Sequence, residues 1–284
     1  MTLPISTHEF FLLRSYIEEQ SGIRLGDDKS YLVENRLSNL VLECGCSSFT
    51  EFYHRIRYSP QAHILKDAVL DAIATNETLW FRDRHPFRVL RETVLPRLQE
   101  EIETGRRERI AIWSAACSTG QEPYSIAMTA LDLYSRRDRE KECERRIRIT
   151  ASDVSGRSLA AARAGSYSEA AICRGLPPAY LHRYFQKAGN CWEIEDRVRD
   201  MISFTQYNLK VPPPRTFGSF DLVFLRNVII YFSDEFKRTL FEKVAGLMSP
   251  RGFLFLGTGE TITGYTETFE PVEDAGCIYY RIRP

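Results

Sequence analysis

From residue 109 onward, short runs of apolar and β-branched residues alternate with segments whose apolar residues recur at helical spacing. This alternation predicts a parallel sheet with crossover helices, the α/β class. The strands are expected at Ile110–Ala115, Ile147–Ser152, Ile202–Tyr207, Leu222–Leu225 and Phe253–Leu256, and the helices at Tyr124–Tyr134, Ser158–Ala164 and Asp234–Met248. Ligands of such sheets bind beyond the carboxyl ends of the strands, so functional residues are expected there.

The first 85 residues have a different pattern. Apolar residues such as Phe10, Leu13 and Ile17 lie at helical spacing, and nothing resembles a strand. After a first helix, further helices are expected at Leu32–Leu42, Phe49–Tyr58 and His63–Ala74. The chain therefore divides into a helical domain at 1–85 and an α/β domain at 86–284, with a strand-rich insertion at about 167–205.

Composition argues against several classes of protein. Thirty-eight Lys and Arg balance thirty-eight Asp and Glu, so no net charge attracts DNA or an anionic membrane. No apolar run reaches the roughly 20 residues of a membrane-spanning helix, and the first residues do not resemble a secretory signal. Seven cysteines include no pair at the spacing of a zinc or redox site. We expect a cytoplasmic monomer that binds no metal, no nucleic acid and no membrane.

Small and polar residues follow the first two predicted strands. Ala115 is followed by a run of small residues that ends at Glu122 and Pro123, so the backbone can approach a ligand closely. The run has neither the Gly-Lys pair of a P-loop nor the three glycines of a dinucleotide site. Asp153 ends the second strand. Its carboxylate suits the two hydroxyls of a ribose or the N-cap of the next helix, and the residues alone leave both open.

Two later strand ends complete the pattern. Asn208 and Leu209 offer an amide and an apolar group suited to the edge and face of an adenine. Arg226 and Asn227 follow the fourth strand, with Tyr231 one turn further on. Together the four strand ends predict an adenosine pocket.

The segment Thr75–Asp83 is interpreted as the last helix of the helical domain. In a helix, Thr78 and Arg82 lie four residues apart and share one face. Taken alone, the segment is more typical of a helix end with a surface arginine near the negative end of the dipole.

Read together, these segments resemble the CheR-type chemotaxis receptor methyltransferases, which esterify glutamates of bacterial chemoreceptors with S-adenosylmethionine. The matching segments, in the family's order, are Thr75–Thr78 before Phe81 and Arg82, Trp113–Ser125, Ala151–Asp153, Arg226–Phe232 and Gly257–Glu260. The resemblance extends from about residue 8 to residue 282. It implies a Rossmann-like class I S-adenosylmethionine-dependent methyltransferase domain, an N-terminal all-helical domain that docks the receptor, and a small antiparallel β-subdomain insertion.

The resemblance also implies roles for individual residues. The positions that match cofactor contacts are Asn76, Thr78, Arg82, Ala115, Glu122, Asp153, Asn208, Leu209, Arg226 and Asn227. Arg82 and Tyr231 match the residues beside the transferred methyl group and are the expected catalytic pair. The implied substrate is the side-chain carboxylate of glutamates in the cytoplasmic domain of methyl-accepting chemotaxis receptors. The loop Lys187–Trp192 looks shorter than in members that tether the receptor's C-terminal pentapeptide, so such tethering is not expected.

A glutamate carboxylate has a reference pKa of about 4.3 and is ionised at neutral pH, so its methylation requires no strong general base. We therefore expect catalysis by alignment and desolvation, with Arg82 orienting the acceptor carboxylate and Tyr231 fixing its approach. Arg36, Arg55 and Arg57 are either a basic face for an acidic receptor helix or ordinary solvated arginines, and the residues alone leave both open.

Other functions fit the residues less well. No Pro-Cys pair is present for cytosine methylation, and Gly257–Gly259 lacks the third glycine of a nicotinamide dehydrogenase. The alternative that stays open is a non-catalytic S-adenosylmethionine-binding module that interacts with receptors.

Overall fold

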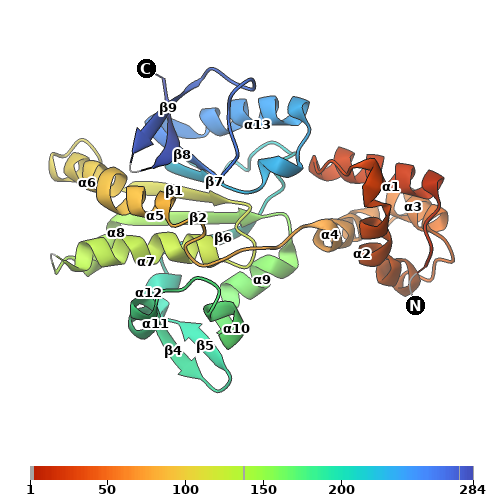
Figure 1. Cartoon of the computed structure of the whole chain (residues 1–284), viewed down its shortest axis with the longest axis horizontal. Helices are drawn as coiled ribbons and strands as arrows, with labels where there is room; N and C mark the ends of the chain where they lie inside the picture. The colour runs from red at the N-terminus through yellow and green to blue at the C-terminus, as the bar shows by residue number, and fades with distance from the viewer. Residues whose placement is uncertain (1–2, 137, 275, 284) are drawn as a thin grey trace.

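The structure is a computed structural model that describes residues 3–136, 138–274 and 276–283. Its N-terminal part is helical and lies beside one end of a large sheet (Figure 1). The helices are α1 (Thr7–Ser21), α2 (Ser30–Glu43), α3 (Phe49–Tyr58) and α4 (Ala62–Ile73), with a 3-10 turn η1 (Asp27–Lys29). Residues such as Leu13, Val33 and Phe52 form a core that belongs to this part alone. No helix among the described residues is long and apolar enough to cross a bilayer.

The segment after α4 corrects one prediction. Thr75–Leu79 is extended and leads into a turn in which Phe81, Asp83 and Arg84 have positive φ, so the helix expected over Thr75–Asp83 is wrong. The backbone groups of this segment bond to other parts of the chain. The Trp80 amide donates to the Arg174 carbonyl at 3.1 Å, and the Phe81 amide donates to Ser125 Oγ at 3.1 Å. These long-range bonds replace the internal bonds of a helix.

The large sheet has seven strands in the order β6-β2-β1-β7-β8-β10-β9. They are β1 (Ile110–Ala115), β2 (Ile147–Asp153), β6 (Ile202–Gln206), β7 (Phe220–Leu225), β8 (Met248–Leu256), β9 (Phe269–Asp274) and β10 (Cys277–Ile282). The first five are parallel, whereas β10 pairs antiparallel with β8 and β9. The α/β class and all five predicted strands are confirmed. The sequence did not predict the final hairpin.

Helices cover both faces of the large sheet (Figure 1). They are α5 (His85–Val89), the π-helical turn η2 (Leu90–Val94), α6 (Leu95–Glu103), α7 (Gln121–Ser135), α8 (Glu140–Arg146), α9 (Gly156–Ala164) and α13 (Asp234–Gly246). Successive strand residues enter different cores: Ile112 and Phe224 pack on one face, and Trp113 and Val223 on the other. This alternation follows from the two-residue period of a strand and explains why the central strands β1 and β7 are mainly apolar.

A small antiparallel sheet lies below the large one in Figure 1 and has the order β3-β5-β4. Its elements are β3 (Ser166–Ser168), α10 (Glu169–Ile172), α11 (Pro178–Tyr184), β4 (Phe185–Ala188), β5 (Cys191–Ile194) and α12 (Asp196–Arg199). The predicted β-subdomain is therefore present. The strand β6 pairs with β2, so the last residues of the range 167–205 lie in the large sheet instead.

Candidate active site

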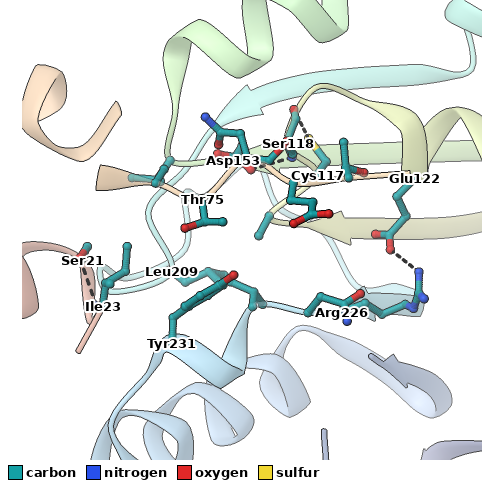
Figure 2. A pocket seen from close by; sticks show the side chains of 18 of the residues that line it. Ser21, Ile23, Thr75, Cys117, Ser118, Glu122, Asp153, Leu209, Arg226 and Tyr231 are labelled. Atoms are coloured by element: carbon teal, nitrogen blue, oxygen red, sulfur yellow. Dashed lines mark hydrogen bonds and ion pairs between the residues drawn. The ribbon is translucent and has the colours of Figure 1, made fainter. Parts of the chain in front are cut away.

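A pocket with about 930 Å³ of empty volume lies at the carboxyl ends of the parallel strands, where the helical part meets the sheet (Figure 2). The structure places all the predicted site residues except Ala115 in its lining: Asn76, Thr78, Arg82, Glu122, Asp153, Asn208, Leu209, Arg226, Asn227 and Tyr231. Predicted residues from five separate segments of the chain thus meet at the place that strand topology predicted.

Ala115 is the exception. It is the last residue of β1, and its side chain packs into the core that includes Trp113 and Val223. The next residues turn the chain toward the pocket: Ala116 and Ser118 have φ values of 57° and 50° and both line it. The ligand-facing part of this loop therefore begins one residue later than expected.

Asp153 is buried at the end of β2 and accepts two backbone hydrogen bonds. The donors are the Ser118 amide at 2.7 Å and the Ser155 amide at 2.9 Å. Burial raises the pKa of Asp153, and these two hydrogen bonds oppose that rise. The N-cap of α9 is Ser155, whose Oγ accepts from the Ser158 amide, so the capping alternative for Asp153 is wrong. Each carboxylate oxygen keeps capacity for one further donor, such as a ribose hydroxyl.

Arg226 ties the turn at residues 82–83 to the sheet. Its guanidinium donates to Glu122 Oε2 at 2.9 Å, Asp83 Oδ2 at 2.7 Å and the Arg82 carbonyl at 2.8 Å. Glu122 also accepts from Ser114 Oγ at 2.7 Å. Burial raises the pKa of Glu122, and the charge of Arg226 opposes that rise. Glu122 and Arg226 were both predicted as cofactor contacts. In the structure their polar atoms bond to other protein groups and stabilise the pocket wall.

Glu260 fixes the loop that carries Tyr231. Its carboxylate accepts from the amides of Asn227 at 2.6 Å, Gly257 at 2.7 Å and Ile230 at 3.3 Å. A Cβ on Gly257 would lie 2.5 Å from Asn227 Nδ2 and 2.7 Å from its amide nitrogen, so only glycine fits there. Gly257–Glu260 belong to the family pattern, but the resemblance implied no role for Glu260.

The helical part supplies a wall that sequence reasoning missed. Ser21 and Ile23 line the pocket, and Ile23 forms an isolated antiparallel bridge with Phe232. The Arg24 amide donates to the Tyr231 carbonyl at 2.7 Å. Asn208 Nδ2 donates to the Gln20 carbonyl at 2.7 Å across 188 residues of sequence, so this amide joins the two parts of the chain. No local signal identifies such contacts.

Arg82 and Tyr231 face the same cavity from different segments. The Arg82 guanidinium donates to the Glu77 carbonyl at 3.2 Å and forms no ion pair within the part of the chain that the structure describes. Figure 2 shows Tyr231 projecting into the pocket opposite the Asp153 side. Burial raises the pKa of the Cys117 thiol well above its usual value, which opposes formation of the nucleophilic thiolate.

The lining fits S-adenosylmethionine. Asp153 offers a buried carboxylate to hydroxyl donors, and the adjoining Val154 and Leu209 offer apolar surface to an adenine. Ala116 and Ser118 let the backbone of the β1 loop approach a ligand closely.

Two family models match the chain. The model described as "CheR methyltransferase, all-alpha domain" matches residues 8–73, and "CheR methyltransferase, SAM binding domain" matches residues 76–277. Chemotaxis protein methyltransferase 1 of Pseudomonas aeruginosa is 41% identical over 276 residues, which are 97% of this chain and 98% of that protein. The chemotaxis protein methyltransferase of Vibrio parahaemolyticus is 39% identical over 282 residues, 99% of either chain. The chain therefore belongs to the CheR methyltransferase family and is an S-adenosylmethionine-dependent methyltransferase.

Proposed function

We propose that this enzyme methylates the side-chain carboxylate of glutamates in the cytoplasmic domain of chemoreceptors and forms methyl esters. The names of its relatives, chemotaxis protein methyltransferases, support a substrate in a chemotaxis-type pathway. The observation that carries the choice of a carboxylate is Arg82. Its guanidinium lines the methyl-transfer pocket without a carboxylate partner among the described residues, and an acceptor carboxylate supplies that partner.

S-adenosylmethionine supplies an electrophilic methyl group on its sulfonium. The acceptor glutamate is ionised at neutral pH, so the enzyme does not need to remove a proton from it. Two carboxylates of the pocket, Asp153 and Glu122, already accept hydrogen bonds from the protein, which suits positioning better than proton transfer. The rate enhancement then comes from holding the acceptor oxygen in line with the methyl carbon and excluding water.

Arg82 orients the acceptor in this proposal. A guanidinium binds both oxygens of a carboxylate in a fixed plane, which restricts the direction of attack. Arg226 holds the backbone of this turn through the Arg82 carbonyl and Asp83, so the orienting arginine has a fixed base. Tyr231 limits the approach from the other side of the cavity.

Each methylation removes one negative charge from the receptor. Loss of a carboxylate weakens electrostatic repulsion between neighbouring acidic helices, which gives a physical route from methylation to altered signalling.

The test uses S-adenosylmethionine labelled in the methyl group and the purified cytoplasmic fragment of a chemoreceptor from the same genome. We expect label on the fragment, its release as methanol in alkali, and methyl esters on glutamates in the mass spectrum. The Arg82→Ala protein is the matched control and should transfer little label. Label that survives alkali would exclude a carboxylate acceptor. Binding of S-adenosylhomocysteine without any transfer would favour a non-catalytic module.

A further inference from the structure

A second groove adjoins the methyl-transfer pocket. The turn at residues 81–84 separates the two cavities: Arg82 lines the pocket, whereas Phe81 and Arg84 line the groove. The groove has about 1090 Å³ of empty volume and also receives residues from α7, from the helix at α5 and η2, and from the segment before α11. Only the turn at residues 81–84, which carries Arg82, therefore separates a molecule in the groove from the methyl-transfer pocket.

One side of the groove is basic. Arg84, Arg88 and Arg91 line it, and no aspartate or glutamate occurs among its described lining residues. Arg84 belongs to the turn before α5, whereas Arg88 lies in α5 and Arg91 in η2, and all three line the groove. Arg84 is exposed. Arg91 bonds to Glu92 at 2.6 Å, which offsets part of this charge. The lining residues still carry a net positive charge, because they include three arginines and no carboxylate.

The floor of the groove is aromatic and apolar. The Phe81 ring lies 5.2 Å from the Phe87 ring and 4.8 Å from the Tyr180 ring, and Leu176 completes the surface. A basic edge beside an apolar floor matches a helix that has acidic residues on one side and apolar residues on the other. It does not match a small anion, which needs no apolar floor.

The wall opposite the arginines is fixed in place. Gly175 has a φ of 103°, and a Cβ there would lie 2.5 Å from the Trp80 carbonyl oxygen. The Trp80 indole donates to the Ala171 carbonyl at 3.0 Å, and its amide donates to the Arg174 carbonyl at 3.1 Å. The groove is therefore preformed, so a partner does not have to order it on binding.

We propose that this groove holds the acidic helical segment of the receptor that flanks the methylated glutamate. This inference rests on the proposed function, which makes the substrate a protein with several carboxylates around its acceptor. The helix crosses the turn at residues 81–84, so that its glutamate reaches Arg82 while its neighbouring acidic residues face Arg84 and Arg88. On the helical part, Arg57 of the predicted basic face is paired with Glu19 at 2.6 Å.

The first experiment reverses charge in the groove. In Arg84→Glu and in Arg84→Glu/Arg88→Glu, we expect the KM for the receptor fragment to rise at least about tenfold, since like charges then face each other. The affinity for S-adenosylhomocysteine should stay unchanged. Arg251→Glu is the matched control, because Arg251 is also exposed, also has a positive φ of 63°, and lies near the start of β8, away from the groove. An unchanged KM in the double variant would overturn the proposal.

The second experiment needs no substitution. Cys173 is an exposed free thiol in the groove, so its alkylation should slow when the receptor fragment binds and should not respond to S-adenosylhomocysteine. Cys191, which does not line the groove, is the internal reference. Equal alkylation of Cys173 with and without a fragment that becomes methylated would overturn the groove and leave the proposed function standing. Protection of Cys173 by a fragment that never forms an ester would overturn the proposed function and leave the groove as a binding site.

Discussion

The two walls of the methyl-transfer pocket are built differently. On the sheet side, Asp153 and Arg226 are only 6% and 5% exposed, and each bonds to at least two protein groups. On the other side, Thr75, Asn76 and Glu77 are exposed on an extended segment. The polar groups of the sheet wall are thus buried, whereas the other wall, here called the closing wall, covers the pocket with a more exposed segment.

The hydrophobic cores of the helical part and of the sheet part are also separate. The helical part has its own core, and it meets the sheet part through a few contacts near the pocket, such as Asn208 with Gln20 and Arg24 with Tyr231. Parts that meet at a limited interface are able to move relative to each other. We therefore expect the affinity for S-adenosylmethionine to depend mainly on the sheet wall, and the rate of methyl transfer to depend mainly on the closing wall.

Arg82→Ala tests the closing wall most directly. We expect kcat to fall about a thousandfold, or about 4 kcal/mol, because the acceptor carboxylate loses its orientation. The dissociation constant of S-adenosylhomocysteine, measured by calorimetry, should change far less. Arg82→Lys keeps the charge but lacks the planar pair of donors. Its kcat should therefore lie between the kcat of the wild type and that of Arg82→Ala. Normal turnover in Arg82→Ala would remove this residue from the mechanism.

Asp153→Asn tests the sheet wall. We expect the dissociation constant of S-adenosylhomocysteine to rise about thirtyfold, or about 2 kcal/mol, since hydrogen bonds to a charged acceptor are lost. The kcat at saturating S-adenosylmethionine should change less than the affinity. The reverse pattern, a lower kcat with unchanged affinity, would contradict the division between the two walls.

The effect of Asp153→Asn on the free energy of unfolding should depend on pH. Burial raises the folded-state pKa of Asp153 above its unfolded value, so ionisation of this group opposes folding. Its contribution to stability is present below the unfolded pKa and is lost as pH rises through the folded pKa. The difference in free energy of unfolding, wild type minus Asp153→Asn, should therefore decrease as pH rises from 4 toward neutrality. Urea unfolding at several pH values measures it, and an increasing difference would contradict the burial argument.

Gly22→Ala tests the junction between the two walls. Gly22 ends α1 with a φ of 77°, and a Cβ there would lie 2.3 Å from the Phe236 ring. The clash should displace the bridge from Ile23 to Phe232 and lower kcat about tenfold, because a shift of about 1 Å is costly for alignment. Gly45→Ala is the matched control: its φ is 69°, but its Cβ would meet nothing within 4 Å. Equal kcat values in the two variants would show that the junction does not position Tyr231.

Arg57→Glu should have the smallest effect. The pair of Arg57 with Glu19 is largely exposed, and exposed pairs contribute little. We expect the KM for the receptor fragment to rise less than about twofold, in contrast to Arg84→Glu. A rise comparable to that of Arg84→Glu would place the receptor on the helical part as well.

Most of the sheet and the position of the site were predictable from local sequence. The central strands β1 and β7 are mainly apolar because both faces of the sheet are covered, and the strand ends carry polar residues because ligands bind there. Asp153, Leu209 and Asn227 could therefore be assigned to one pocket. The family pattern added Thr78 and Arg82, which local periodicity placed on a helix that does not exist.

Contacts between distant segments required the tertiary structure. The turn at residues 81–84 depends on Arg226, which is 144 residues away from the Arg82 carbonyl that it binds. Ile23 reaches the pocket only because the helical part packs against Phe232. Local periodicity reports which face of an element is buried, but it carries no information about which distant donor satisfies a given carbonyl. For this reason the sequence located the pocket, whereas the closing wall and the groove beside it became visible only in the folded chain.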